Sequence, residues 1–111
     1  MNDILSVLED ERVMMYELVK YAQFQQKALI YHDADELDRL AAEQKELLAA
    51  MQQKEVSRWK LLAARMSIST REASELAMSE LIPTLEGYEQ EVFKKLHSEL
   101  KGLLGEWQLL N

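Results

Sequence analysis

The stretch from Leu8 to Leu62 contains neither glycine nor proline. These two residues interrupt helices most strongly, so their absence permits unusually long helices here. The only short polar break in the stretch is His32-Asp33-Ala34-Asp35. We therefore expect residues 1–66 to form two long helices folded back on each other at this break. Such a hairpin points to binding of other helices, because it offers no obvious pocket for catalysis.

Apolar residues in both halves of the hairpin recur with alternating spacings of four and three, the pattern of amphipathic helices. Asp33 and Glu36 form a capping-box-like pair at the start of the second helix. Folding the hairpin near residue 33 also brings Glu11 and Arg12 towards Arg58 and Glu55. Each helix would be about 45 Å long, which predicts a rod. One buried seam is expected to contain Leu8, Met15, Leu48, Met51 and Leu62.

Residues 67–111 are expected to complete a single all-α domain with a further helical region. Ser69 and Glu72 match a capping box, which predicts a short helix. Pro83 lacks a backbone donor, so we expect a kink or break there before a final helix. The short helix is expected to contain Ala73, Leu76, Ala77 and Leu81.

The final helix carries the most apolar and aromatic face of the chain. This face either packs on the hairpin or receives an amphipathic helix from a partner, with anchors at helical spacing. It is wide for one packing partner, so Phe93, Leu104 and Trp107 are expected to be exposed. The candidate client-binding residues are Tyr88, Val92, Phe93, Leu96, Leu100, Leu103, Leu104 and Trp107.

Charge and composition exclude several classes of partner. The net charge is −7 and the isoelectric point is near 4.8, which argues against nucleic acids and anionic membrane surfaces. No apolar run approaches the roughly 20 residues of a membrane span. The first residues lack the basic region of a secretory signal. We therefore expect a cytoplasmic protein without stable membrane insertion, and the thin core leaves a homo-oligomer open.

The sequence offers no catalytic, metal-binding or cofactor-binding residues. Cysteine is absent, and neither His32 nor His97 has a second ligand at metal-site spacing on its own helix. Phosphate-binding glycine motifs, zinc-protease motifs and the paired Glu-x-x-His motif of di-iron bundles are also missing. An enzyme is therefore not expected, and neither is a cofactor.

Five short segments of the hairpin carry a family resemblance. They are Leu8-Glu9-Asp10-Glu11-Arg12, Gln26-Lys27-Ala28-Leu29, His32-Asp33-Ala34-Asp35-Glu36-Leu37, Lys45-Glu46-Leu47-Leu48 and Arg58-Trp59-Lys60-Leu61-Leu62. Together they resemble the FlgN family of bacterial flagellar export chaperones. The resemblance implies an all-helical cytoplasmic protein that binds C-terminal segments of hook-associated proteins before type III export. It also implies delivery of these clients to the export gate and no catalytic residues.

Other functions remain open at this point. The related FliT family, which serves the filament cap, has short acidic helical hairpins of similar design. A generic helical adaptor or a self-associating coiled coil would show the same periodicity. An enzyme or a metal-binding bundle is the least favoured alternative.

Overall fold

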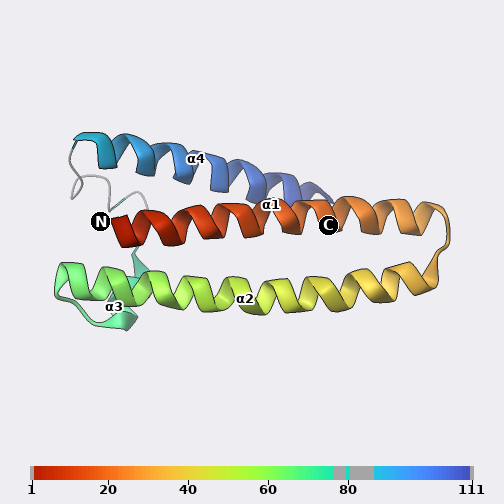
Figure 1. Cartoon of the computed structure of the whole chain (residues 1–111), viewed down its shortest axis with the longest axis horizontal. Helices are drawn as coiled ribbons and strands as arrows, with labels where there is room; N and C mark the ends of the chain where they lie inside the picture. Colours follow the sequence, from red (N-terminus) through yellow and green to blue (C-terminus); the bar gives the residue numbers. More distant parts are fainter. Residues whose placement is uncertain (1, 77–79, 81–86, 111) are drawn as a thin grey trace.

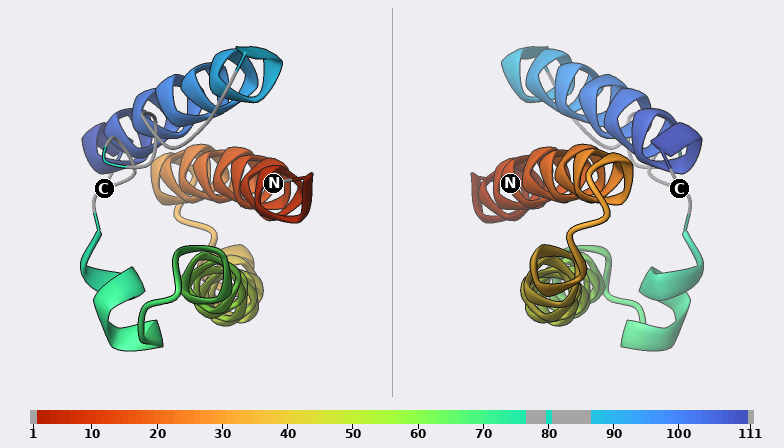
Figure 2. Two further views of the ribbon diagram at one scale, coloured as in Figure 1. Left: turned by 90° about the vertical axis from the view of Figure 1, so that its left-hand side faces the viewer. Right: turned by 90° about the vertical axis from the view of Figure 1, so that its right-hand side faces the viewer.

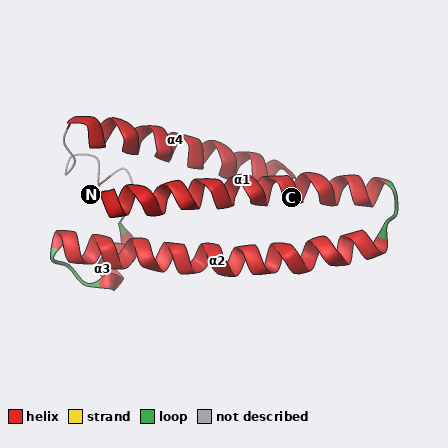
Figure 3. Ribbon diagram, viewed as in Figure 1, coloured by secondary structure: helices red, strands yellow, loops and turns green. Residues whose placement is uncertain are grey.

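The computed structural model describes residues 2–76, 80 and 87–110, and its regular elements are all helices within these residues. Helix α1 spans Asn2–Ile30, α2 spans Ala34–Met66, α3 spans Thr70–Glu75 and α4 spans Gly87–Leu110 (Figures 1 and 3). The molecule measures 51 × 24 × 20 Å, so the expected rod is confirmed. The all-α hairpin is confirmed as well. The expected break at Pro83 lies outside the described residues.

The turn between α1 and α2 is fixed by hydrogen bonds at both helix ends. His32 adopts a left-handed backbone with φ of 53°, and the next amide, of Asp33, donates to the Ala28 carbonyl oxygen at 2.9 Å. This is the bonding pattern of a Schellman cap. Asp33 then caps α2, because its Oδ1 accepts from the backbone amide of Glu36 at 3.0 Å. The Glu36 side chain pairs with Arg39, so only half of the expected capping-box-like pair is formed.

The other end of α2 also closes on a left-handed residue. Ser67 has φ of 55°, and its amide donates to the Ala63 carbonyl oxygen. Chain direction then changes, and Ser69 caps α3 in a complete capping box with Glu72, as predicted. Helix α3 is shorter than predicted, because it ends before Leu76, which has an extended backbone. The expected helical residues Ala77 and Leu81 lie outside the described part of the chain.

Helix α1 is the middle of three long helices and lies between α2 and α4 (Figures 1 and 2). Helix α2 runs antiparallel to α1, as the Lys54–Asp10 pair at 2.8 Å shows. Helix α4 runs parallel to α1. Arg12 Nε lies 3.4 Å from Glu99 Oε2, near the middle of α4. Gln26, further along α1, donates to the carbonyl oxygen of Leu110 at the end of α4. In the described residues the α2 and α4 backbones do not approach each other.

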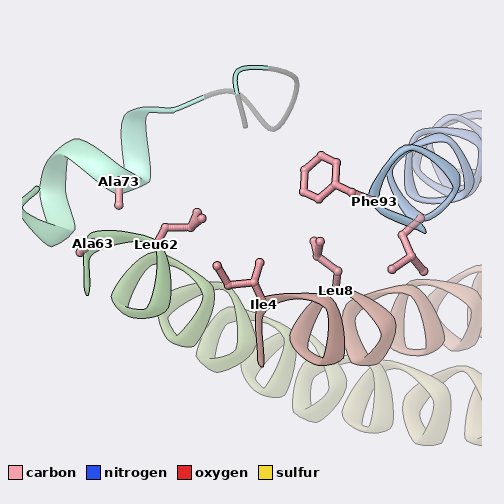
Figure 4. Packing of buried hydrophobic residues seen from close by; sticks show 7 residues of the cluster. Ile4, Leu8, Leu62, Ala63, Ala73 and Phe93 are labelled. Atoms are coloured by element: carbon pink, nitrogen blue, oxygen red, sulfur yellow. The ribbon is translucent and has the colours of Figure 1, made fainter. Parts of the chain in front are cut away.

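The main hydrophobic core lies where α1 begins, α2 ends and α3 folds back (Figure 4). Burial of such apolar side chains is the principal favourable term in folding. All three long helices contribute, and α3 adds a small residue that permits close packing. The buried members are Ile4, Leu8, Leu62, Ala63, Ala73, Phe93 and Leu96.

Candidate functional site

The predicted client-binding face of α4 does not form one continuous surface. Phe93 is 0% exposed and Leu96 is 7% exposed. Figure 4 shows Phe93 reaching from α4 into the core beside Leu8. The expectation that Phe93 is exposed is therefore wrong. The physical reason is that the first turns of α4 pack against the core formed with α1, α2 and α3, and Phe93 lies in this part of the helix.

The other candidate residues of α4 differ widely in exposure. Leu104 is 44% exposed, as expected, and Tyr88 is 81% exposed. Trp107 is partly buried and partly exposed, so its expected exposure is found only in part. The three remaining candidates are also partly buried: Val92, Leu100 and Leu103. Their side chains thus combine contacts within the protein with some surface left for a partner.

A groove of about 570 Å³ lies between α2 and α4, with α1 as its floor. It arises because α2 and α4 pack on different sides of α1 without meeting. Its apolar lining consists of Met15, Leu48, Met51, Leu100 and Leu104. Its polar lining consists of Glu11, Gln52, Glu55, Arg58, His97 and Lys101.

The groove shows where the predicted buried seam fails. Leu8, Met15 and Leu62 are buried as predicted, but Met51 is only partly buried. Leu48 is 43% exposed, so the expectation that it is buried is wrong. The sequence contained a signal for this opening. Gln44, Glu55 and Arg58 interrupt the second seam, and polar residues at such spacing are typical of a seam that is not fully enclosed.

An ion pair crosses from α1 to α2 at the edge of the groove. Glu11 Oε2 accepts from Arg58 Nη1, and the two side chains are only 13% and 14% exposed. Burial raises the pKa of Glu11, and this outweighs the opposing effect of the Arg58 charge. The predicted approach of Glu11 to Arg58 is confirmed. Arg12 does not join them, since it pairs with Glu9 and Glu99 instead.

The side chains that line the groove suit binding of a partner. In the parts of the chain that the structure describes, no group of three or more His, Cys, Asp or Glu residues could hold a metal ion. None of the described helices is long and apolar enough to cross a membrane. The groove instead offers flexible apolar side chains, and methionine in particular adapts to differently shaped partners.

Comparison with protein families decides what kind of binding protein this is. The family model described as FlgN protein matches residues 1–111, the whole chain. The chain belongs to the FlgN family. No curated protein and no solved structure matched it.

Membership in the FlgN family makes the protein a chaperone of flagellar type III export. The predicted family resemblance is therefore confirmed, although it was based on segments of the hairpin alone. A chaperone in this family needs a surface for its export substrates. In the described structure, the groove is where apolar side chains from three long helices remain accessible together.

Proposed function

We propose that this FlgN-family chaperone binds the helical C-terminal tails of hook-associated proteins in the groove between α2 and α4. It would act in the cytoplasm and deliver these clients to the type III export apparatus. The observation that carries the proposal is the apolar groove itself, which is flanked by two helices that do not contact each other. Family membership supports an export substrate as its occupant.

The chemistry of the groove suits an amphipathic helix. An amphipathic helix placed over α1 would contact α2 and α4 at once and complete a four-helix arrangement. Its apolar anchors, recurring at three- and four-residue spacing, would meet the methionines and leucines of the groove. Leu48 and Leu104, at 43% and 44% exposure, are the groove leucines with the most apolar surface left to bury.

The proposal changes the role of several residues predicted to bind clients. Leu100 and Leu104 line the groove and remain candidates for direct contact. Phe93 and Leu96 instead hold α4 against α1, so they would position the groove wall. Tyr88 and Val92 line a separate, more polar hollow between α1 and α4, which would make at most a secondary contact with a client.

Substitution of the two groove leucines tests the proposal. In the double variant Leu48→Ser and Leu104→Ser, we expect affinity for a hook-associated C-terminal peptide to fall at least tenfold, a loss of about 1.4 kcal/mol or more. Isothermal titration calorimetry measures this change. Binding should depend only modestly on salt, because the anchors are apolar.

Leu109→Ser provides the matched control, because Leu109 is 89% exposed on α4 and does not line the groove. This variant should bind the peptide as the wild type does. Circular dichroism of all variants checks that the helices are intact. Undiminished affinity in the double variant would contradict binding in the groove.

A further inference from the structure

The two walls of the groove carry opposite charges. Glu55 belongs to the α2 wall and Lys101 to the α4 wall. Glu11 and Arg58, which also line the groove, neutralise each other in their ion pair. His97, the other titratable residue of the α4 wall, carries no negative charge in either protonation state. A helix in the groove therefore meets a negative charge on one side and a positive charge on the other.

Both wall charges are available to a partner. Lys101 is exposed, and within the described residues it takes part in no ion pair. The Glu55 side chain is 46% exposed, and its Oε1 lies 3.8 Å from Arg58 Nη2. That contact is long, and Arg58 donates instead to Glu11. The Glu55 carboxylate can therefore still accept hydrogen bonds from a partner.

The two wall charges lie almost opposite each other across the groove. The residue before Glu55 pairs with Asp10 of α1. Two residues before Lys101, Glu99 of α4 pairs with Arg12 of α1. Because Asp10 and Arg12 are close neighbours on α1, the two wall charges are within about one helical turn of each other along the groove.

Unlike walls can distinguish the two directions of a bound helix. A helix whose apolar face lies on α1 turns one flank towards α2 and the other flank towards α4. When this helix is turned end for end with its apolar face still on α1, the two flanks exchange places. A client with a cation on one flank and an anion on the other then matches the wall charges in one direction only. Charges that flank an apolar seam set helix orientation in coiled coils for the same reason.

We propose that Glu55 and Lys101 determine the direction in which a client helix lies in the groove. The client would carry Lys or Arg on the flank that meets Glu55, and Asp or Glu on the flank that meets Lys101. This inference rests on the proposed binding of client helices in the groove, and adds the chemistry of their flanks. Apolar anchors would supply the affinity, and the charges would select the direction. The rest of every client would then leave the groove at the same end of the rod.

Two designed peptides test the inference on the full chain. Both are amphipathic helices with leucines at three- and four-residue spacing. The charged peptide has lysines on one flank and glutamates on the other, and the neutral peptide has glutamines on both flanks. A nitroxide label on the N-terminus of each peptide broadens the NMR signals of nearby amides. The broadened signals show whether this end lies towards the core or towards the hairpin turn.

The charged peptide should bind the wild type mainly in one direction, with about a five- to tenfold excess over the other. The neutral peptide should broaden signals at both ends of the groove. The double variant Glu55→Lys with Lys101→Glu keeps the net charge and should reverse the direction of the charged peptide. Glu91→Lys with Lys95→Glu is the matched control, because both residues are exposed on α4 and do not line the groove. This control should leave the direction unchanged.

An unchanged direction in the variant Glu55→Lys with Lys101→Glu would overturn the inference, and so would a single direction for the neutral peptide. The variant Leu48→Ser with Leu104→Ser separates these results from failure of the groove itself. Undiminished affinity of this variant for the charged peptide would contradict binding in the groove. Weakened affinity there, together with an unchanged direction after the charge exchange, would contradict only the role of the two charges. Absence of binding by both peptides would overturn both proposals.

Discussion

The two ends of the rod differ in how their helices are held together. At the end where α1 begins, side chains from α1, α2, α3 and α4 enclose a common core. At the opposite end, the hairpin turn leaves Leu29, Ile30 and Tyr31 at 59%, 73% and 72% exposure. There the buried apolar side chains are fewer, with Ala28 and Leu40 at 5% and 1% exposure, and Gln25 Nε2 of α1 donates to Gln44 Oε1 of α2 at 3.1 Å.

This contrast indicates that the two ends of the molecule have different roles. Burial of large apolar side chains stabilises the core end, where α3 and the first turns of α4 close the structure. The groove begins beyond that core and continues towards the turn end. A firm closed end can hold two helices apart without filling the space between them, so that a partner can fill it.

Truncation of a core aromatic should have the largest effect. Phe93→Ala removes a completely buried ring from the core, and we expect a loss of about 3–5 kcal/mol in the free energy of unfolding. Phe24→Ala, in the half of α1 nearer the hairpin turn, should cost less than about 1 kcal/mol because Phe24 is half exposed. Urea denaturation of both variants measures the difference. Equal losses would mean that the two ends are equally well packed.

Replacement of the glutamine pair should strengthen the turn end. Gln25 and Gln44 are partly buried, and the Nε2 of Gln44 is buried without a hydrogen-bond acceptor among the described residues. The double variant Gln25→Leu and Gln44→Leu removes both polar groups, so we expect a gain of about 1–2 kcal/mol in the free energy of unfolding. The single variant Gln25→Leu should be worse than the double, since it leaves Gln44 without its donor. Thermal denaturation compares all three proteins.

Two backbone substitutions should each stabilise the fold modestly. His32 has φ of 53° at the hairpin turn. His32→Gly should raise the free energy of unfolding by about 0.5–1 kcal/mol, because glycine adopts the left-handed conformation at a lower cost. Gly102 lies within α4, where an added Cβ meets no atom within 4 Å. Gly102→Ala should therefore raise the free energy of unfolding by about 0.5–1 kcal/mol, because alanine has the higher helix propensity. A loss of stability in a urea titration of either variant would contradict this account of the backbone.

The smallest expected effect is a pH dependence that arises beside the groove. The pKa of Glu11 is raised above the usual 4.5 by burial, so the folded protein binds a proton that the unfolded chain releases. Between the pKa of Glu11 in the unfolded chain and its raised pKa in the folded protein, the free energy of unfolding should fall as the pH rises. Glu11→Gln should remove this dependence. The pKa of Glu9 is lowered by its hydrogen bond to Arg12, so its contribution should have the opposite sign and be lost as the pH falls. Unfolding free energies of Glu11→Gln and Glu9→Gln across acidic pH separate the two contributions.

Local signals predicted the elements of the fold well. The absence of glycine and proline placed the two long helices, and short-range capping placed Asp33 and Ser69 at helix starts. Spacing along the hairpin also predicted the contact between Glu11 and Arg58. These features depend on residues close in sequence, or on the simple geometry of one antiparallel turn, and both can be worked out from the order of residues.

The depth at which each part of α4 is buried could not be predicted in the same way. Phe93 and Leu104 are eleven positions apart, which is about three helical turns, so they lie on nearly the same side of α4 and periodicity alone did not distinguish them. The structure buries Phe93 and leaves Leu104 exposed because α4 packs on α1 beside the core formed with α2 and α3. This choice depends on contacts between residues far apart in sequence. The polar residues Gln44, Glu55 and Arg58 in the α2 seam indicated an opening, but the position of α4 as the second wall of the groove could not be predicted from them.

The parallel packing of α1 and α4 has a consequence for the order of folding during synthesis. Gln26 contacts the Leu110 carbonyl oxygen across 84 positions of the chain, whereas α1 and α2 are joined by a short turn. The hairpin can therefore form while the ribosome is still producing α4, because local contacts close with a smaller loss of entropy. The side of α1 that receives α4 stays uncovered until α4 has been made. Of the three long helices, α1 is thus made first and completely covered last.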